Sequence, residues 1–498
     1  MTARKPRTPA QRRAASPEVL AGERPLELSP EQLRAMIDGA TRAILAHLET
    51  LPEQPMHATG GGQRLARSLR EPMPERGEAF QALLDGLFRR VIPRSFNTAS
   101  PGYLAYIPGG GLLHAAVADL VSDAVNRYVG VWLAAPGLAQ LEANVVRWFA
   151  EIVGYGATPA PGGLLTSGGS MSNLIATVTA REEVLGEDFA RGVVYASDQA
   201  HHSVLKAARF AGFRRDQVRA VPSDARLRMD VRALRAAIAE DARAGRAPCL
   251  VVASAGTTNT GAVDDLGALA DVAAKARLWL HVDAAYGGFF ALTERGRAAL
   301  AGLERADSIT LDPHKGLFLP YGTGALVVRD VERLRRAHAM HAEYLPPMQR
   351  DPDFTDFCDL GPELSRDFRG LRVWLPMKMH GAGAFRDALD EKLDLARSAC
   401  DAIRALPDVE IVAEPELSLF AFRLAARGRW SALGGAELDR LNRDWMRAVN
   451  KRQRVFLTGT VVRERFVIRA CVLSFRTHAD RIEMLLEDLR AGLSALSR

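Results

Sequence analysis

The feature that most constrains the fold is an alternation of two kinds of segment between residues 98 and 385. Short runs rich in Val, Ile and Leu alternate with longer Ala-rich stretches of helical periodicity. This alternation predicts βαβ units, and therefore a large α/β domain whose mostly parallel sheet is covered by helices on both faces. The expected strands are 192–196, 250–255, 278–283, 308–311 and 324–329, and the expected helices between them include 231–244 and 266–276.

Three further regions flank this large domain at residues 98–385. Residues 26–97 are predicted to form a helical arm, with one helix starting at Ser29-Pro30 and a second, amphipathic helix at 78–91. Residues 386–498 combine helical and strand patterns, which predicts a small C-terminal α+β domain. Residues 1–25 carry six basic and two acidic residues and are predicted to be a disordered basic tail.

Charge and composition exclude several classes of protein. The net charge of +6 comes mostly from the tail, so we expect no basic surface for nucleic acid on the body of the protein. No apolar run is long enough to cross a membrane. The four cysteines form no close pair, which fits neither a disulfide framework nor a zinc site, and predicts a reducing, cytoplasmic environment.

Four segments carry side chains suited to chemistry, and three of them lie at or after the ends of expected strands. Residues 166–173 form a Gly-Ser loop before a helix, which favours an anion at the helix N-terminus. Residues 197–203 contain His201, whose ring could stack on an aromatic ligand. Asp283 ends an apolar strand and is followed by small residues, and Lys315 follows the strand at 308–311. A partly desolvated site would favour the neutral, nucleophilic form of the lysine.

Each of these signals taken alone also has an ordinary structural explanation. Lys315 could be a surface lysine, Asp283 a helix N-cap, the Gly-Ser loop a simple helix start, and His201 a structural histidine. A metal pair of His201 and His202 is disfavoured, because adjacent side chains point apart, so no metal site is expected. Together, however, a phosphate cradle, an aromatic stacker, a carboxylate and a lysine describe a site for pyridoxal phosphate, which needs a lysine and an acidic partner for its ring nitrogen.

Three motifs of the sequence resemble those of a known family. The motifs Ser-Asp-Gln-Ala-His (197–201), His-Val-Asp-Ala-Ala-Tyr (281–286) and Pro-His-Lys (313–315) are similar to those of the group II pyridoxal-phosphate-dependent amino acid decarboxylases, the family of aromatic-L-amino-acid decarboxylase. The resemblance runs from about residue 27 to the C-terminus. It implies the aspartate-aminotransferase-like fold (fold type I) and a homodimer with active sites at the subunit interface.

The resemblance also implies roles for individual residues. Lys315 would bind the cofactor covalently with support from His314, Asp283 would pair with the ring nitrogen, and His201 and Ala285 would pack on the two ring faces. The substrate would be a small-molecule amino acid, which loses carbon dioxide through an external aldimine and a quinonoid to leave an amine. Further residues implied are Ser170, Met171 and Ser172 for the phosphate, Thr258 and Asp312 near the cofactor, and Tyr106, Ile107 and Pro108 for the substrate.

Some positions depart from the family pattern. The position that we align with the family's loop tyrosine is Phe357, which has no proton to donate to the reacting carbon. Relatives with Phe there can release an aldehyde, ammonia and peroxide. Either another group protonates the carbon, or the chain is an aldehyde synthase. The candidate donors are Tyr344, His341, His202 and water. Gly316, where aromatic-substrate members often have Trp, and Asp312, where some relatives have Asn, leave the substrate open.

Residues 344–363 contain several prolines and little periodicity, and we expect them to close over the active site as a lid. A glutamate- or cysteine-sulfinate-type decarboxylase remains an alternative, although residues 103–111 hold no Lys or Arg for an acidic side chain. A non-catalytic protein that only binds the cofactor is a further alternative, against which the presence of Lys315 and Asp283 counts.

Overall fold

The computed structural model describes residues 26–158, 160–340, 351 and 353–496. The described residues up to Leu51, together with Ala58–Ser95, form one compact unit, and Pro52–His57 with the chain from Phe96 onward forms a second. No helix of the described chain is both long and apolar enough to cross a bilayer. The two units are considered separately below.

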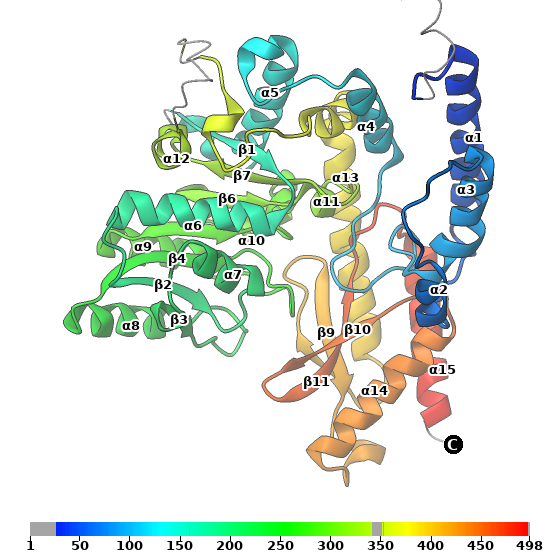
Figure 1. Ribbon diagram of the computed structural model, residues 1–498. Coiled ribbons are helices and arrows are strands. Elements are labelled where there is room, and N and C mark those ends of the chain that lie inside the picture. The colour runs from blue at the N-terminus through cyan, green and yellow to red at the C-terminus, as the bar shows by residue number, and fades with distance from the viewer. Residues whose placement is uncertain (1–25, 159, 341–350, 352, 497–498) are drawn as a thin grey trace, which may run out of the picture. The chain divides into compact units, whose positions relative to one another are not determined.

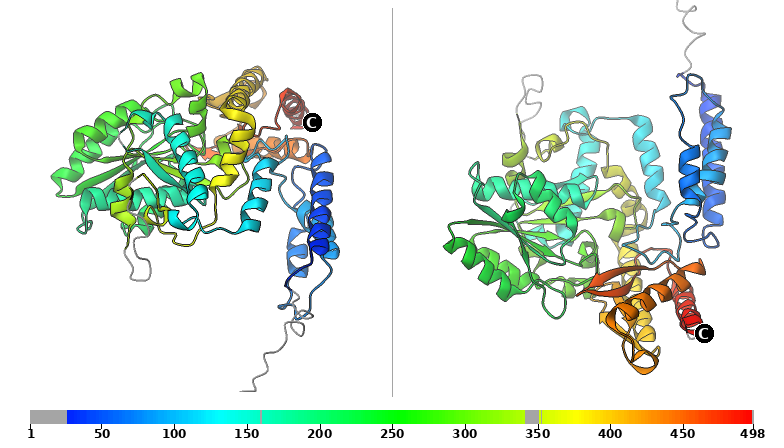
Figure 2. Two further views of the ribbon diagram at one scale, coloured as in Figure 1. Left: turned by 90° about the horizontal axis from the view of Figure 1, so that it is seen from above. Right: turned by 60° about the horizontal axis from the view of Figure 1, so that its bottom comes forward.

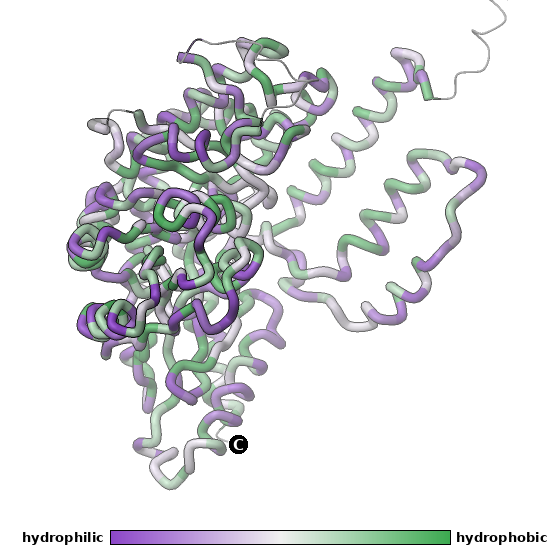
Figure 3. Tube along the Cα trace, turned by 60° about the vertical axis from the view of Figure 1, so that its left-hand side comes forward, coloured by the Kyte–Doolittle hydropathy of each residue, from purple (hydrophilic) through white to green (hydrophobic). Residues whose placement is uncertain are grey.

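The first unit is helical, as predicted for the arm. It contains α1(Pro30–Glu49), α2(Gly62–Ser68) and α3(Phe80–Gly86), followed by a π-helical turn at Leu87–Val91 and a short 3-10 turn at Ile92–Arg94. Helix α1 starts where the sequence predicts, because the Ser29 side chain accepts from Gln32 N and the Gln32 side chain accepts from Ser29 N. Hydrophobic and hydrophilic residues alternate along these helices (Figure 3), and several large apolar side chains stay exposed within the unit.

The second unit is built on a seven-stranded sheet in the order β1-β7-β6-β5-β4-β2-β3. Strands β2 to β6 pair parallel to one another, and β7 runs antiparallel to both of its neighbours. The mostly parallel sheet is therefore confirmed. The strands are β1(Gly162–Thr166), β2(Gly192–Ser197), β3(Val218–Val221), β4(Ala247–Ser254), β5(Trp279–Asp283), β6(Ser308–Leu311) and β7(Gly324–Val328) (Figure 1).

Two of these strands, β1 and β3, were not predicted. Strand β1 begins with Gly162-Gly163, which is a poor strand signal in sequence. The structure explains the second glycine: a Cβ at Gly163 would lie 2.0 Å from the backbone oxygen of Leu326 on β7, and its φ of 149° also disfavours a side chain. Strand β3 is short and only partly buried, so its pattern is weak.

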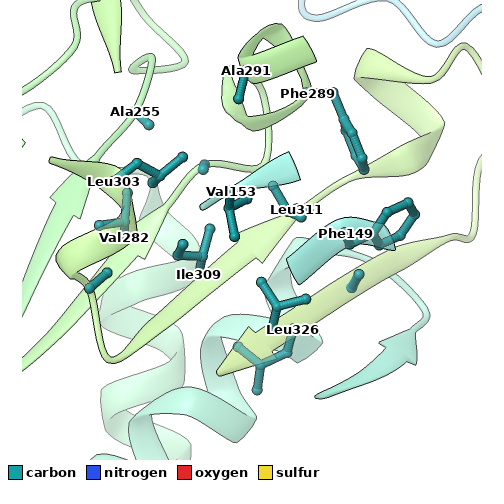
Figure 4. Packing of buried hydrophobic residues seen from close by; sticks show 14 of the residues in the cluster. Phe149, Val153, Ala255, Val282, Phe289, Ala291, Leu303, Ile309, Leu311 and Leu326 are labelled. Carbon is teal, nitrogen blue, oxygen red and sulfur yellow. The ribbon is translucent and has the colours of Figure 1, made fainter. Parts of the chain in front are cut away.

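Helices cover both faces of this sheet (Figure 2). Helix α6 packs against β4 to β7 and against α7 and α12, while α8 and α9 pack together and against the neighbouring strands. Side chains of β5, β6 and β7, such as Val282, Ile309 and Leu326, lie in the core near Phe149 and Phe289 (Figure 4). The helices are α4(Leu113–Val125), α5(Pro136–Ile152), α6(Gly169–Leu185), α7(His202–Phe210), α8(Val231–Arg243), α9(Leu266–Ala276), α10(Glu294–Ala299), α11(Pro313–Gly316) and α12(Val331–His338).

The C-terminal part holds a four-stranded antiparallel sheet in the order β10-β11-β9-β8. Its own core gathers around Trp445, Phe420 and Phe422. The predicted boundary at 385/386 falls inside the long helix α13(Gly370–Arg404), shortly after a kink at Gly381 (φ 71°), so the large and small parts share a helix. The remaining elements are β8(Val409–Ala413), β9(Leu419–Leu424), α14(Gly435–Lys451), β10(Thr458–Val462), β11(Arg465–Cys471) and α15(Ala479–Leu496).

Candidate active site

The four predicted segments meet in one cavity of about 290 Å³ at the carboxyl ends of the strands. Residues after β1, β2, β4, β5 and β6 all contribute to its wall. Parallel strands end at the same edge of a sheet. Strand β1 also ends there, because it is antiparallel to β7, which is itself antiparallel to β6. Segments far apart in the sequence are thereby brought to one site.

Lys315 lies on the short helix α11, directly after β6, with its side chain 21% exposed. Its Nζ is 2.8 Å from Oδ2 of Asp312. Burial alone would lower the pKa of Lys315, but the charge of Asp312 and the hydrogen bond to it, with a contribution from Asp283, raise the pKa above its ordinary value. Desolvation therefore acts in the expected direction, but the neighbouring carboxylates outweigh it and favour the ammonium form of Lys315.

His314 lines the cavity beside the lysine. Its Nδ1 is 2.6 Å from the carbonyl oxygen of Thr323, and because a carbonyl only accepts, Nδ1 carries the hydrogen. Burial lowers the pKa of His314, so the imidazole is neutral at neutral pH and its Nε2 is an acceptor. That Nε2 lies 3.6 Å from Asp312 Oδ2.

Asp283 ends β5 and presents its carboxylate to the cavity. One oxygen accepts from the Asn173 amide at 2.9 Å, and the other accepts from the backbone N–H of Ala285 at 3.2 Å. Two donors in fixed directions hold the carboxylate in one orientation. Such a carboxylate can accept a hydrogen bond from a protonated ring nitrogen.

Asn173 connects this carboxylate to a buried hydrogen-bond network. Its Oδ1 accepts from the Thr310 hydroxyl at 2.7 Å and from His281 Nε2 at 3.0 Å. Burial lowers the pKa of His281 to about 4, so this ring is neutral. The other ring nitrogen of His281 accepts from Ser308, whose oxygen accepts in turn from the indole of Trp279, both at 2.8 Å. Buried side chains of β5 and β6 thus fix the orientation of the Asn173 amide, and the Asn173 amide in turn orients the Asp283 carboxylate.

His201 is the N-cap of α7 and lines the same cavity. Its Nδ1 accepts from the backbone N–H of Ser203 and lies 2.7 Å from that residue's hydroxyl, which also accepts from Asn173. Burial lowers the pKa of His201, so the neutral ring carries its hydrogen on Nε2. His202 is exposed and does not line the cavity, although its ring centroid is 4.1 Å from that of His201.

The N-terminus of α6 forms the anion-binding part of the cavity. Gly168, Gly169, Ser170 and Met171 line it, and the first N–H groups of a helix are free to bind an anion. A Cβ at Gly169 would lie 3.1 Å from Asp312 and 3.2 Å from Ala285, so only glycine fits without displacing its neighbours. Ser172 does not contribute to this wall: it is fully buried, and its hydroxyl lies 2.8 Å from Thr166 Oγ1.

Thr258 and Ala285 line the cavity as predicted, whereas Tyr106, Ile107 and Pro108 do not. Tyr106 is half exposed with φ 52°, and its carbonyl accepts from Arg469 Nη2 at 2.9 Å. Arg469 is 5% exposed, and its Nε is buried without a hydrogen-bond partner among the described residues. A buried cation therefore lies beside the 103–111 segment, which the composition of that segment alone could not reveal.

Phe357 is not part of the cavity. It lies in a short 3-10 turn (Phe357–Asp359), is 1% exposed, and packs in the main core with the Arg366 guanidinium 5.1 Å from its ring centre. Arg366 is itself buried against Glu142 at 2.6 Å. In the described chain Phe357 therefore lies outside this cavity, and its role in the reaction stays a prediction. Tyr344 and His341 lie outside the described residues.

Sequence reasoning missed several residues that shape the site. Asn173, Ser203, Ser254 and Tyr286 line the cavity, and Tyr286 is fixed there by a hydrogen bond with Ser418 at 3.0 Å. Asn173 lies in the Gly-Ser segment at 166–173 and Tyr286 in the motif at 281–286, and these positions were the only sequence signal that either residue lines the site. Their partners lie more than a hundred residues away along the chain, which no local pattern indicates.

The arrangement fits pyridoxal phosphate. An amine, a fixed carboxylate, an imidazole, a small residue and a helix N-terminus line one cavity, and each matches a different part of that cofactor. The residues that could hold it are Lys315 for the aldehyde carbon, Asp283 for the ring nitrogen, His201 and Ala285 for the ring faces, and Gly169, Ser170 and Met171 for the phosphate.

Comparison with known proteins agrees with this site. The family described as the pyridoxal-dependent decarboxylase conserved domain matches residues 63–425. An aromatic-L-amino-acid decarboxylase of Bacillus atrophaeus is 35% identical over 94% of this chain and 96% of its own length. A phenylacetaldehyde synthase of Petunia hybrida is 27% identical over 92% of this chain and 93% of its own.

Among solved structures, that of Oryza sativa TDC with PLP and tryptamine superposes with a TM-score of 0.90 at 29% identity, covering 96% of this chain and all of the other. The chain belongs to the pyridoxal-dependent decarboxylase family and is a pyridoxal-phosphate-dependent amino acid decarboxylase of fold type I.

Proposed function

We propose that the enzyme converts an aromatic L-amino acid into the corresponding amine and carbon dioxide. The observation that supports the amine product is the 35% identity to an aromatic-L-amino-acid decarboxylase of Bacillus atrophaeus over 94% of this chain. The aromatic substrate is supported by the named activity of the Bacillus atrophaeus relative and by the lack of Lys or Arg at 103–111.

In this proposal the residues of the cavity have distinct tasks. When bound, the cofactor supplies a conjugated ring that takes up the electrons left at Cα. Lys315 would hold the aldehyde carbon until the substrate amine enters, and the carboxylate of Asp283 would accept a hydrogen bond from the protonated ring nitrogen. His201 packs on one ring face with its Nε2–H available as a donor, and Ala285 leaves room on the other face.

The N-terminus of α6 holds the phosphate through Gly169, Ser170 and Met171, and Thr258 lies in the same wall. His314 stays neutral beside Lys315, so it adds no positive charge to compete for the phosphate. Ser172 supports the loop through Thr166 instead of contacting the cofactor. Each of these roles can be tested by substitution, with cofactor affinity as the readout.

The proton that returns to Cα needs a donor. His202 is exposed outside the cavity, which counts against it, and we propose Tyr344 as the donor because a phenol can both donate a proton and exclude oxygen when it covers the site. The segment 344–363 was predicted to act as the lid. Tyr344 lies outside the described residues, and Phe357 and Leu360 in the C-terminal half of the segment are buried, so we keep the lid proposal only for the part that precedes Phe357. Limited proteolysis with and without a substrate analogue tests the lid, and equal cleavage rates would contradict it.

Product analysis tests the proposed reaction directly. Purified holoenzyme is incubated in air with tyrosine, tryptophan, phenylalanine, Dopa, glutamate and cysteine sulfinate, and amine, aldehyde, ammonia and peroxide are measured. We expect amine from an aromatic substrate, and an increase in aldehyde and peroxide for Tyr344→Phe. Aldehyde and peroxide as the main products of the wild-type enzyme would instead support an aldehyde synthase.

The acidic amino acids in this test address the second candidate. Arg469 is a buried cation next to the 103–111 segment and could serve a glutamate-type side chain. Turnover of glutamate or cysteine sulfinate faster than of any aromatic amino acid would favour that candidate. Absence of turnover of all six amino acids, with the cofactor bound, would mean that the enzyme acts on another amino acid.

The proposal includes a homodimer with active sites at the interface. Two observations support it. The Tyr106 side chain is half exposed on the second unit, and the helices of the first unit carry exposed apolar side chains, including Leu33, Ile37 and Leu83. Light scattering coupled to size-exclusion chromatography measures the mass, and a monomer under assay conditions would contradict it. A cytoplasmic location is proposed on the four free thiols, which suit a reducing compartment.

A further inference from the structure

Tyr286 connects the wall of the cofactor cavity to the C-terminal sheet. It follows β5, lines the cavity and is 2% exposed. Its hydroxyl oxygen accepts from the backbone N–H of Ser418 at 2.9 Å and lies 3.0 Å from the Ser418 hydroxyl. Burial raises the pKa of Tyr286, so the side chain stays a neutral phenol. The hydroxyl is therefore anchored on Ser418, a residue that does not itself line the cavity.

Ser418 holds that hydroxyl in a fixed position. It is buried directly before β9, and its carbonyl oxygen accepts from Val472 N at 2.8 Å, directly after β11. At the same end, Leu419 of β9 pairs with Cys471 of β11. The backbone of Ser418 is thus part of the ladder between these two strands. A side chain that binds to its N–H therefore takes its position from the C-terminal sheet.

The ring of Tyr286 packs against the part of the wall that follows β4. Gly256, Thr257 and Thr258 of this segment all line the cavity. A Cβ at Gly256 would lie 2.6 Å from Cδ1 of the Tyr286 ring, and the φ of 97° also disfavours a side chain there. The backbone of Gly256 therefore lies directly against the ring. A shift of the ring would change the position of this part of the wall.

The turn at 257–262 also contacts the C-terminal sheet. The Thr257 N–H donates to the Ala262 carbonyl at 2.9 Å, and the Gly261 N–H donates to the Thr257 carbonyl at 2.8 Å, so the turn is closed by backbone hydrogen bonds. A Cβ at Gly261 would lie 2.9 Å from the carbonyl oxygen of Leu419, the first residue of β9. The turn therefore meets the C-terminal sheet directly at one end and through the phenol ring at the other.

We propose that Tyr286 and Ser418 are positioning residues, which hold the wall at 256–258 in place against the cofactor. Removal of the phenol hydroxyl leaves the buried Ser418 N–H without its acceptor, which is unfavourable. The ring can then move, and the wall loses part of its support. The expected result is weaker binding of the cofactor. This role depends on the cofactor and not on the proposed substrate, since no amino acid takes part in it.

Cofactor affinity tests this role on the full chain. Affinities for pyridoxal phosphate are measured by equilibrium dialysis for the wild type, Tyr286→Phe, Ser418→Ala and the control Tyr155→Phe. Tyr155 is also fully buried, and its hydroxyl donates to the Ala306 carbonyl at 2.8 Å, away from the cavity. We expect a loss of about tenfold in Tyr286→Phe, a smaller loss in Ser418→Ala, which keeps the backbone N–H, and a change below about twofold in the control.

Hydrogen–deuterium exchange of the cofactor-free chain measures the wall directly. Amides at 256–262 should exchange faster in Tyr286→Phe than in the wild type, and at the wild-type rate in Tyr155→Phe. The circular dichroism of the bound cofactor should change in Tyr286→Phe and not in the control. Should Tyr286→Phe fail to fold, Ser418→Ala provides the same comparisons. Equal losses of affinity in Tyr286→Phe and Tyr155→Phe, or unchanged exchange at 256–262, would overturn the proposal.

Discussion

Replacing Asn173 by Leu should reveal how much the buried network behind Asp283 stabilises the protein. The Asn173 amide forms hydrogen bonds with four different side chains, and the residue is 2% exposed. Leucine has a similar size, so the substitution removes the hydrogen bonds without opening a large cavity. The partners that lose their bonds are Asp283, Ser203, Thr310 and His281.

The magnitude follows from which partners can find a new bond. The hydroxyls of Ser203 and Thr310 can rotate, and the Thr310 oxygen, which lies 3.2 Å from His281 Nε2, can accept from that ring. The Asp283 oxygen that faced Asn173 has no such replacement and is left without its donor. A buried polar group left without a partner costs about 1–3 kcal/mol. This one group therefore predicts a loss of about 1–3 kcal/mol in the free energy of unfolding, in addition to the net contribution of the other lost hydrogen bonds.

Urea denaturation without the cofactor measures this loss, with Thr177→Val as the matched control. Thr177 is also buried on α6, one turn after Asn173, and its hydroxyl only donates to the Asn173 backbone oxygen at 2.7 Å. We expect the control to lose about 1 kcal/mol. An equal loss in the two variants, with native circular dichroism in both, would refute the idea that the network holds Asp283 and His201 in place.

Three other substitutions test separate parts of the structure. Lys315→Ala should reduce kcat by about a thousandfold or more, because the covalent link to the cofactor is lost, and borohydride treatment should then add no mass to its peptide. Phe357→Tyr should place a hydroxyl in the core, lowering the free energy of unfolding by about 1–3 kcal/mol, and should leave the amine-to-aldehyde ratio unchanged; a changed ratio would return Phe357 to the active site. Burial raises the pKa of Asp264 from 3.8 to about 6. The folded state thus holds this proton more tightly than the unfolded state, and the residue's contribution to stability should fall by about 3 kcal/mol as the pH rises from about 4 to about 6. Asp264→Asn should remove that dependence from urea titrations across the window, and an unchanged pH profile would contradict it.

The sequence by itself was enough to predict those strands and helices that are specified by the pattern of apolar residues within a short segment. The apolar runs at β5 and β6 predict buried parallel strands because both faces of such strands are covered, and α9 was predicted with its observed bounds. Lys315, Asp283, His201 and the Gly-Ser loop could be proposed together because each directly follows a strand or opens a helix. The order of such segments along the chain is enough to predict that they share one edge of the sheet.

Only the tertiary structure decided how these groups interact. Asn173 and Asp283 are 110 residues apart, and no periodicity indicates that they share a hydrogen bond. The ammonium state of Lys315 depends on the approach of Asp312 within a desolvated wall, and the burial of Phe357 depends on Arg366 and the packed core around it. Local patterns specify which face of an element is buried, whereas distances between side chains, and the pKa values that follow from them, arise only when distant segments pack together.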